Sequence, residues 1–142
     1  MTVPPAVTVL MSAMNAAPYI REAVDSVLSQ TFTDFEFIVF DDASTDSTAA
    51  ILGTYSDERL ILIKNTQNQG LTLNLIKGMD MARGEFVVRI DADDVCMPRR
   101  IERQVEFMRG NPEIGLSCCS VAFFGDGRSD VIVHQPEDHD RI

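Results

Sequence analysis

Residues 86–94 read Phe-Val-Val-Arg-Ile-Asp-Ala-Asp-Asp, so three carboxylates (Asp91, Asp93 and Asp94) directly follow an apolar, strand-like run. Carboxylates this close disfavour one another's ionisation unless a cation or hydrogen-bond donors compensate. Mg²⁺ and Mn²⁺ prefer oxygen ligands, and one or two carboxylates with substrate phosphates make a typical site. A solvated acidic turn before a helix, with Pro98 in its first turn, would give the same pattern. The run alone leaves both interpretations open.

Apolar runs alternate with segments of helical period along the rest of the chain. Continuous apolar runs predict buried strands at 7–11, 35–40, 60–63, 86–90 and 115–124. The spacing of the apolar residues between them predicts a helix capped by Asn15 and running to Leu28, one from a cap at Ser44 or Thr45 to about residue 55, one from 71 to about 84, and one over 101–110. From residue 125 onward the chain is polar and acidic, and no further packed element is expected.

This order of elements predicts the fold class and the place of a site. Alternating strands and helices imply an α/β domain with a mostly parallel sheet flanked by helices on both faces. Ligands of such sheets bind beyond the carboxyl ends of the strands. Three of these ends are polar, at 12–15, 41–44 and 91–94. Because solvation alone explains two acidic clusters at one edge poorly, we expect a binding site there.

Composition narrows the class of protein. The 142 residues, 45% of them hydrophobic, suffice for a single domain spanning 1–142. The net charge of −10 argues against a nucleic-acid partner, which needs clustered Lys and Arg. No apolar run reaches the roughly 18 residues of a membrane span, and residues 1–5 lack signal-peptide features. The three cysteines (Cys96, Cys118 and Cys119) lack metal-site spacing, and the adjacent pair reads as small buried residues. A cytoplasmic protein is expected.

A family resemblance rests on motifs that occur in order between residues 7 and 124. The segments VTVLM (7–11), SQTFTDFE (29–36), FDDASTD (40–46), NQG (68–70), ARGEF (82–86) and DADD (91–94), the last followed by Met97-Pro98, resemble family 2 glycosyltransferases of the GT-A fold. This resemblance implies a nucleotide-diphosphate sugar donor, expected to be UDP-linked. It also implies an inverting, metal-dependent transfer to a glycan or cell-surface polysaccharide acceptor, in the cytoplasm or at the inner face of the membrane.

The resemblance also implies a set of site residues. Asp42 is expected to contact the base, and the acids at 91–94 are expected to bind the ribose and a Mn²⁺ or Mg²⁺ ion that bridges the diphosphate, with Asp93 favoured and Asp94 next as metal ligand. The full set expected to bind the nucleotide is Ser12, Ala13, Met14, Asn15, Asp42, Asn68, Gly70, Asp91 and Asp93.

The chain departs from the family pattern at three places. Met14 stands where the family has an aromatic residue that stacks on the base, and Ile76 stands where it has an Asn in the third helix. The general base of the family lies beyond the fifth strand, so it is expected after residue 142. We therefore expect the donor half with a polar tail at 125–142, without the acceptor half, and inactive in transfer. The apolar surface left uncovered would favour a homo-oligomer.

The same residues also allow other interpretations. Asp41 is interpreted as structural, with its side chain accepting backbone groups of the turn. Asn68 and Gly70 are also typical of a turn. A Rossmann dehydrogenase would need a Gly-rich loop after the first strand, and residues 12–19 contain no glycine. An aspartyl phosphatase would carry its acids after the first strand, and a nucleotidyltransferase would need a basic, Gly-rich loop there. A non-catalytic nucleotide-binding or assembly module stays as the alternative function.

Overall fold

The computed structural model describes residues 3–123 and 131–134. The chain forms two compact units, Met1–Val105 and Glu106–Ile142. In the first unit the strands β1 (Val7–Ala13), β2 (Phe35–Asp41), β3 (Leu60–Lys64) and β4 (Phe86–Arg89) alternate with the helices α1 (Ile20–Leu28), α2 (Thr48–Leu52) and α3 (Leu71–Met81). Helix α4 (Arg100–Gly110) begins in this unit and ends in the second, which also contains β5 (Val121–Phe123) and β6 (Val131–Val133).

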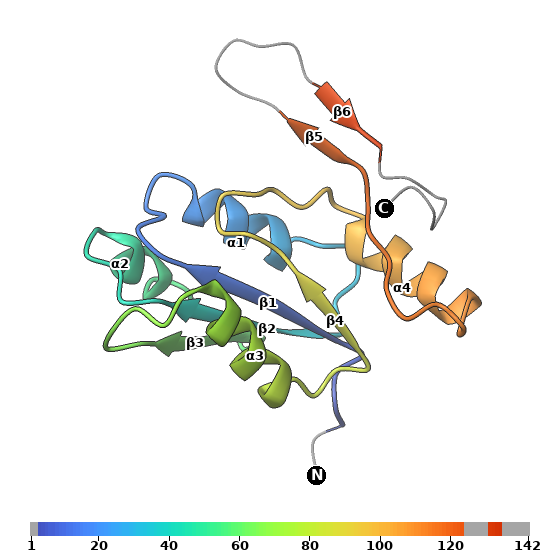
Figure 1. Ribbon diagram of the computed structural model, residues 1–142, viewed down its shortest axis with the longest axis horizontal. Helices are drawn as coiled ribbons and strands as arrows, with labels where there is room; N and C mark the ends of the chain where they lie inside the picture. The colour runs from blue at the N-terminus through green and yellow to red at the C-terminus, as the bar shows by residue number, and fades with distance from the viewer. Residues whose placement is uncertain (1–2, 124–130, 135–142) are drawn as a thin grey trace. The chain divides into compact units, whose positions relative to one another are not determined.

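The four strands of the first unit form one parallel sheet in the order β3-β2-β1-β4 (Figure 1). β1 pairs with β2 from Val7 opposite Phe35 to Ala13 opposite Asp41, and it pairs with β4 on its other side. The predicted α/β class with a mostly parallel sheet is therefore confirmed. All four strands point the same way, so their carboxyl ends lie along one edge of the sheet.

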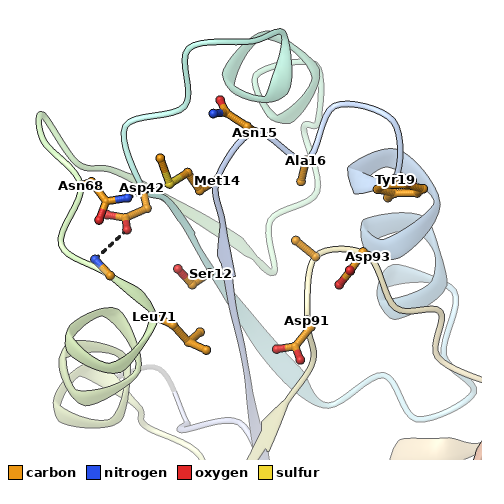
Figure 2. Close-up of a pocket in the computed structure, with 12 residues that line it drawn as sticks. Ser12, Met14, Asn15, Ala16, Tyr19, Asp42, Asn68, Leu71, Asp91 and Asp93 are labelled. Atoms are coloured by element: carbon orange, nitrogen blue, oxygen red, sulfur yellow. Dashed lines mark hydrogen bonds between the residues drawn. The ribbon is translucent and has the colours of Figure 1, made fainter.

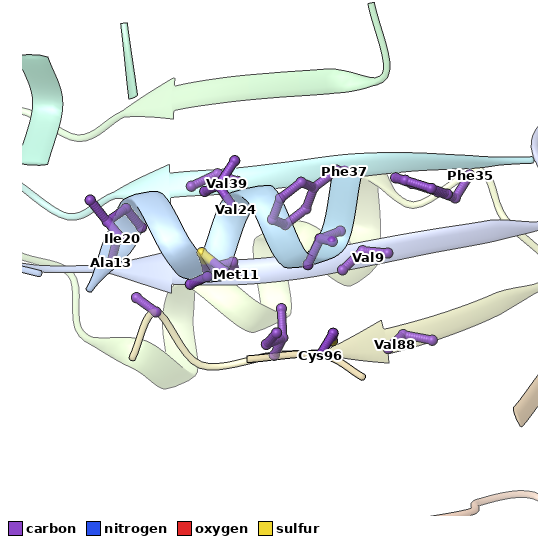
Figure 3. Close-up of a cluster of buried hydrophobic side chains, with 14 of the residues drawn as sticks. Val9, Met11, Ala13, Ile20, Val24, Phe35, Phe37, Val39, Val88 and Cys96 are labelled. Atoms are coloured by element: carbon purple, nitrogen blue, oxygen red, sulfur yellow. The ribbon is translucent and has the colours of Figure 1, made fainter. Parts of the chain in front are cut away.

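Helices cover both faces of the sheet, and alternate strand residues face each layer. On one face, alternate residues of β1 and β2 pack with α1 (Figure 3), where the labelled side chains include Val9, Met11, Ile20, Val24 and Phe37. The buried Ile101 and Val105 of α4 belong to the same cluster. The other face carries a smaller cluster, in which Leu10, Ile38 and Phe40 pack with Leu75 of α3. The first layer therefore contributes most of the burial, at about 25 cal/mol for each Å² of apolar surface removed from water.

A buried acid joins the strands near their amino ends. Glu36 is only 3% exposed and accepts hydrogen bonds from the Thr8 hydroxyl (2.7 Å), the Arg83 amide (2.8 Å) and the Arg83 guanidinium (2.7 Å). Burial opposes ionisation of Glu36, but these hydrogen bonds outweigh it and lower its pKa. Thr8 also accepts from the Gly84 amide, and a Cβ at Gly84 would lie 2.4 Å from the Thr8 nitrogen. Glycine is therefore required at position 84, where the chain passes from α3 to β4.

The helix caps differ from those expected. Tyr19, not Asn15, precedes the first turn of α1, and Ser47 precedes α2 in place of Ser44 or Thr45. Asn15 has a φ of 51°, and its side-chain oxygen accepts hydrogen bonds from the Thr45 and Asp46 amides. Asn15 therefore joins two loops at the carboxyl edge instead of starting a helix. An asparagine accepts backbone N–H groups both as a helix cap and as a link between loops. The residue type alone therefore does not distinguish these two roles.

The prediction for the end of the chain is wrong in two respects. The run 115–124 does not add a fifth strand to the parallel sheet; only Val121–Phe123 is a strand, and it pairs antiparallel with β6 in a separate two-stranded sheet. A strand also follows residue 125, at Val131–Val133. Pairing with a nearby segment closes a shorter loop and costs less chain entropy than joining a distant edge. Cys118 is exposed and Cys119 half-buried, so the adjacent cysteines are not core residues.

Glu36→Gln should lower the free energy of unfolding at neutral pH by roughly 1–3 kcal/mol, because Gln leaves at least one of the buried donors without an acceptor. The measurement is urea denaturation between pH 3 and pH 7. The folded-state pKa of Glu36 lies below its ordinary value of 4.5, so its stabilisation is present above pH 4.5 and is lost as the pH falls through the folded pKa. The variant and the wild type should therefore converge in acid. The exposed Glu58→Gln is the matched control, and an equal loss in both variants would contradict the role of Glu36.

Candidate functional site

A pocket of about 440 Å³ lies at the carboxyl edge of the parallel sheet (Figure 2). Asp42, Met14 and Asn68 gather on one side of it, and Asp93 and Tyr19 lie on the other (Figure 2). Its volume is within the range of small-molecule sites, about 300–1,000 Å³. The residues that line it are Ser12, Met14, Asn15, Ala16, Tyr19, Asp42, Asn68, Gly70, Leu71, Asp91, Ala92 and Asp93.

Asp42 fixes the loop that borders one side of this pocket. One of its carboxylate oxygens accepts hydrogen bonds from the Asn65 side chain (2.7 Å) and the Gln69 amide (2.8 Å), and the other accepts from the Gly70 amide (2.8 Å). Its side chain is buried, and its own amide donates to the Ala13 carbonyl (2.8 Å). The carboxylate therefore holds the 65–70 loop against the end of β1.

These hydrogen bonds determine the charge of Asp42. Burial raises the cost of ionisation, but the donors from Gln69, Asn65, Asn74 and Gly70 outweigh it and lower the pKa of the carboxyl group. Asp42 is therefore anionic at neutral pH. A buried anion at the wall of a pocket is a hydrogen-bond acceptor of fixed position, which suits recognition of an N–H group.

A buried asparagine in α3 extends the network to the floor of the pocket. Asn74 is fully buried; its amide nitrogen donates to the Ser12 hydroxyl (2.9 Å), and its oxygen accepts from the Asn65 side chain (2.8 Å). The sequence analysis predicted neither Asn65 nor Asn74; the position that it singled out in this helix, Ile76, is exposed. The available signal was a polar residue at position 74, on the same helical face as Leu71, Leu75 and Gly78.

Met14 and Asn68 form the exposed rim beside Asp42. Met14 is 50% exposed, and its sulfur accepts a hydrogen bond from the Asn68 amide nitrogen (2.6 Å). Thioether side chains pack favourably against ring edges and faces. A flat heterocycle that reached Asp42 would therefore meet an apolar side chain at this rim.

The three acids after β4 have different surroundings. Asp91 is held by Arg89 in an ion pair of 2.8 Å, and Asp93 is exposed and lines the pocket. Asp94 is exposed but does not line the pocket. Partial loss of hydration by neighbouring protein atoms, the charge of Asp91 and the charge of Asp93, in that order, raise the pKa of Asp94. The mutual repulsion expected from the sequence is thus present around Asp94.

The residues present fit a shared cation and not a closed protein cage. No group of three or more His, Cys, Asp or Glu side chains that could hold a metal ion occurs within residues 3–123 and 131–134. Asp93 nevertheless has no hydrogen-bond partner among the residues that the structure describes, so its carboxylate oxygens are available at the pocket. Mg²⁺ and Mn²⁺ sites made of one or two carboxylates with substrate phosphates need no more from the protein.

The structure gathers the predicted residues with two exceptions. Ala13 is fully buried in β1 and contributes its carbonyl to Asp42, and Asp94 lies outside the lining. Every other residue predicted for the nucleotide borders the pocket, and sequence reasoning missed Ala16, Tyr19, Leu71 and Ala92 there. Arg89 pairs with Asp91, and Asp41 accepts the Ser44 amide (3.2 Å), consistent with the structural interpretation of Asp41.

The family model for glycosyl transferase family 2 matches residues 8–141. The chain belongs to this family. An uncharacterized glycosyltransferase of Methanocaldococcus jannaschii is 34% identical over 94% of this chain and 47% of its own length. The crystal structure of S. aureus TarS 1–349 in complex with UDP-GlcNAc has a TM-score of 0.71 and 26% identity, over 87% of this chain and 36% of that one.

A second solved structure has a metal ion in its complex. The mannosyltransferase PcManGT of Pyrobaculum calidifontis, in complex with GDP-Man and Mn²⁺, has a TM-score of 0.67 and 32% identity, over 75% of this chain and 33% of that one. These neighbours confirm the GT-A fold predicted for the glycosyltransferase chain. The chain spans between 35% and 54% of the length of the first curated relatives that it matches. None of the described helices is long and apolar enough to cross a membrane.

Asp42→Asn should release the 65–70 loop and leave the sheet intact. An asparagine keeps the shape but turns an N–H₂ group toward the amides of Gln69 or Gly70, which leaves a donor unpaired at about 1–3 kcal/mol. Amide hydrogen exchange should therefore accelerate at Gln69 and Gly70 and stay slow at Phe37. The exposed Asp80→Asn is the control. In the wild type the same amides should lose protection only as the pH falls below 3.8, since the pKa of Asp42 is lowered from that value. Unchanged exchange in Asp42→Asn would refute this anchoring role.

Proposed function

We propose that this chain binds a UDP-linked sugar in the pocket, as the donor for metal-dependent, inverting transfer to a glycan acceptor. The observation that carries the proposal is the arrangement of the pocket, which has the buried, anionic Asp42 on one side and the exposed carboxylate of Asp93 on the other. A nucleoside diphosphate is complementary to this arrangement. Its base carries N–H groups that a carboxylate can accept, and its diphosphate is an anion that requires a cation.

The base is assigned to the Asp42 side of the pocket. A carboxylate offers about four acceptor positions, and donors from Asn65, Gln69 and Gly70 occupy three of those on Asp42. The Asn74 side chain also acts on this carboxylate, so Asp42 has room for at most one further N–H group. Uracil presents a single ring N–H between two carbonyls, whereas guanine presents two neighbouring donors. The remaining acceptor favours uracil, and Met14 would lie against the ring.

The diphosphate is assigned to the Asp93 side. The chain carries a net charge of −10, so the diphosphate needs a compensating cation here. A divalent cation, Mn²⁺ or Mg²⁺, would be held by Asp93 and would stabilise the charge that develops on the leaving diphosphate. Asp91 is assigned to the ribose hydroxyls, and Asp94 acts as a neighbouring charge. The UDP-GlcNAc complex of TarS and the GDP-Man and Mn²⁺ complex of PcManGT support these assignments by similarity.

Calorimetry with UDP should give at least about tenfold tighter binding with Mn²⁺ than without it, equivalent to about 1.4 kcal/mol. Asp93→Ala should abolish this metal dependence, while Asp80→Ala should preserve it. The Asp93 variant should keep the melting temperature of the wild type or exceed it, because one repelling carboxylate is removed. GDP should bind more weakly than UDP. Equal UDP affinity with and without metal would contradict the cation assignment, and an unfolded Asp93→Ala would show that this acid is structural.

The configuration of the product tests the inverting course of the transfer. The protein that contains this chain is incubated with UDP-sugars and a panel of glycan acceptors, and the anomeric configuration of the product is read by NMR. An α-linked donor should yield a β-linked product. A retained configuration would contradict the inverting assignment while leaving donor binding untouched.

A further inference from the structure

Arg89, the last residue of β4, holds the first acid of the 91–94 run in a two-pronged ion pair. Its Nη2 lies 2.8 Å from Oδ1 and 2.9 Å from Oδ2 of Asp91, and its Nε lies 3.0 Å from Oδ1. The side chains are 53% and 44% exposed. The backbone of Arg89 is itself fixed, since its carbonyl accepts a hydrogen bond from the Arg100 guanidinium (3.0 Å).

This ion pair occupies both oxygens of Asp91. Guanidinium groups match carboxylates in a planar, two-point geometry that a lysine does not reproduce. Hard divalent cations need several oxygen ligands, and their affinity rises with the number and charge of carboxylates offered. With Asp91 paired, the side of the pocket near Asp93 offers fewer free carboxylate oxygens than the sequence suggests.

We propose that Arg89 is a positioning residue that withholds Asp91 from the cation, so that the empty pocket binds Mn²⁺ weakly and the cation enters together with the nucleoside diphosphate. This inference rests on the proposed function, since it assumes that Asp93 holds a cation shared with a diphosphate. The same ion pair fixes the rotamer of Asp91, so the orientation of its carboxylate is set by Arg89 and not by a metal ion. Asp91 thereby remains available to the ribose of the nucleotide, while Asp93 binds the cation.

The test measures Mn²⁺ binding by electron paramagnetic resonance in the absence of nucleotide. Arg89→Gln should bind Mn²⁺ at least about tenfold more tightly than the wild type, because it frees a carboxylate and removes a nearby positive charge. Arg103→Gln, at an exposed position of α4, removes the same charge from the chain and should leave Mn²⁺ affinity within about twofold of the wild type. The double variant Arg89→Gln/Asp91→Asn should return Mn²⁺ affinity to the wild-type level, since the freed ligand is then absent.

Three results would overturn the inference. Unchanged Mn²⁺ affinity in Arg89→Gln would show that Asp91 is not withheld, and equal gains in Arg89→Gln and Arg103→Gln would show an effect of net charge alone. A double variant as tight as Arg89→Gln would show that Asp91 is not the ligand released. Circular dichroism melting of each variant establishes that it is folded. The proposed function fails separately, if the wild type does not bind UDP, because the Mn²⁺ titrations contain no nucleotide.

Discussion

The buried carboxylate of Asp42 joins three parts of the chain that are distant in sequence. It stands at the end of β2, its amide donates to the end of β1, and its oxygens accept the amides of the 65–70 loop that leads into α3. Asn65 extends the same set of hydrogen bonds to Asn74 and so to Ser12. This side of the pocket is therefore joined through one buried group, with a second link from the Asn65 amide to the Asp41 carbonyl (2.9 Å).

Glu36, a buried acid near the amino end of β2, and Asp42, directly after its carboxyl end, hold opposite ends of α3. Glu36 holds the turn between α3 and β4, and Asp42 holds the loop before α3. Both ends of α3 are therefore attached to β2 through carboxylates whose pKa is lowered by the hydrogen bonds they accept, in opposition to burial. Polar contacts at both ends thus supplement the small apolar cluster through which α3 packs on its face of the sheet.

Apolar periodicity sufficed to predict the strands and helices of the first unit, because continuous apolar runs and helical spacing indicate which side chains are buried. The family motifs led to most of the pocket. The hydrogen bonds of Asn65 and Asn74 were not predicted, because their partners are distant in sequence. A local sequence pattern does not indicate such partners. Asn15 was misassigned for the same reason: its partners lie in the loop after β2. The strand at Val121–Phe123 was expected in the wrong sheet because an apolar run indicates a strand but not its neighbour.

The position of β1 in the sheet affects the order in which strands can pair during translation. β1 is an interior strand of the parallel sheet, yet it precedes the other three strands along the chain, and its second neighbour, β4, begins only at Phe86. Pairings over such sequence separations form slowly, because the entropy of closing the intervening chain is lost before the contact forms. During translation one edge of an apolar strand therefore stays open while α1, β2, α2, β3 and α3 emerge. An open apolar edge is a template for pairing with other chains, so a nascent chain arrested before β4 would be a natural substrate for a chaperone.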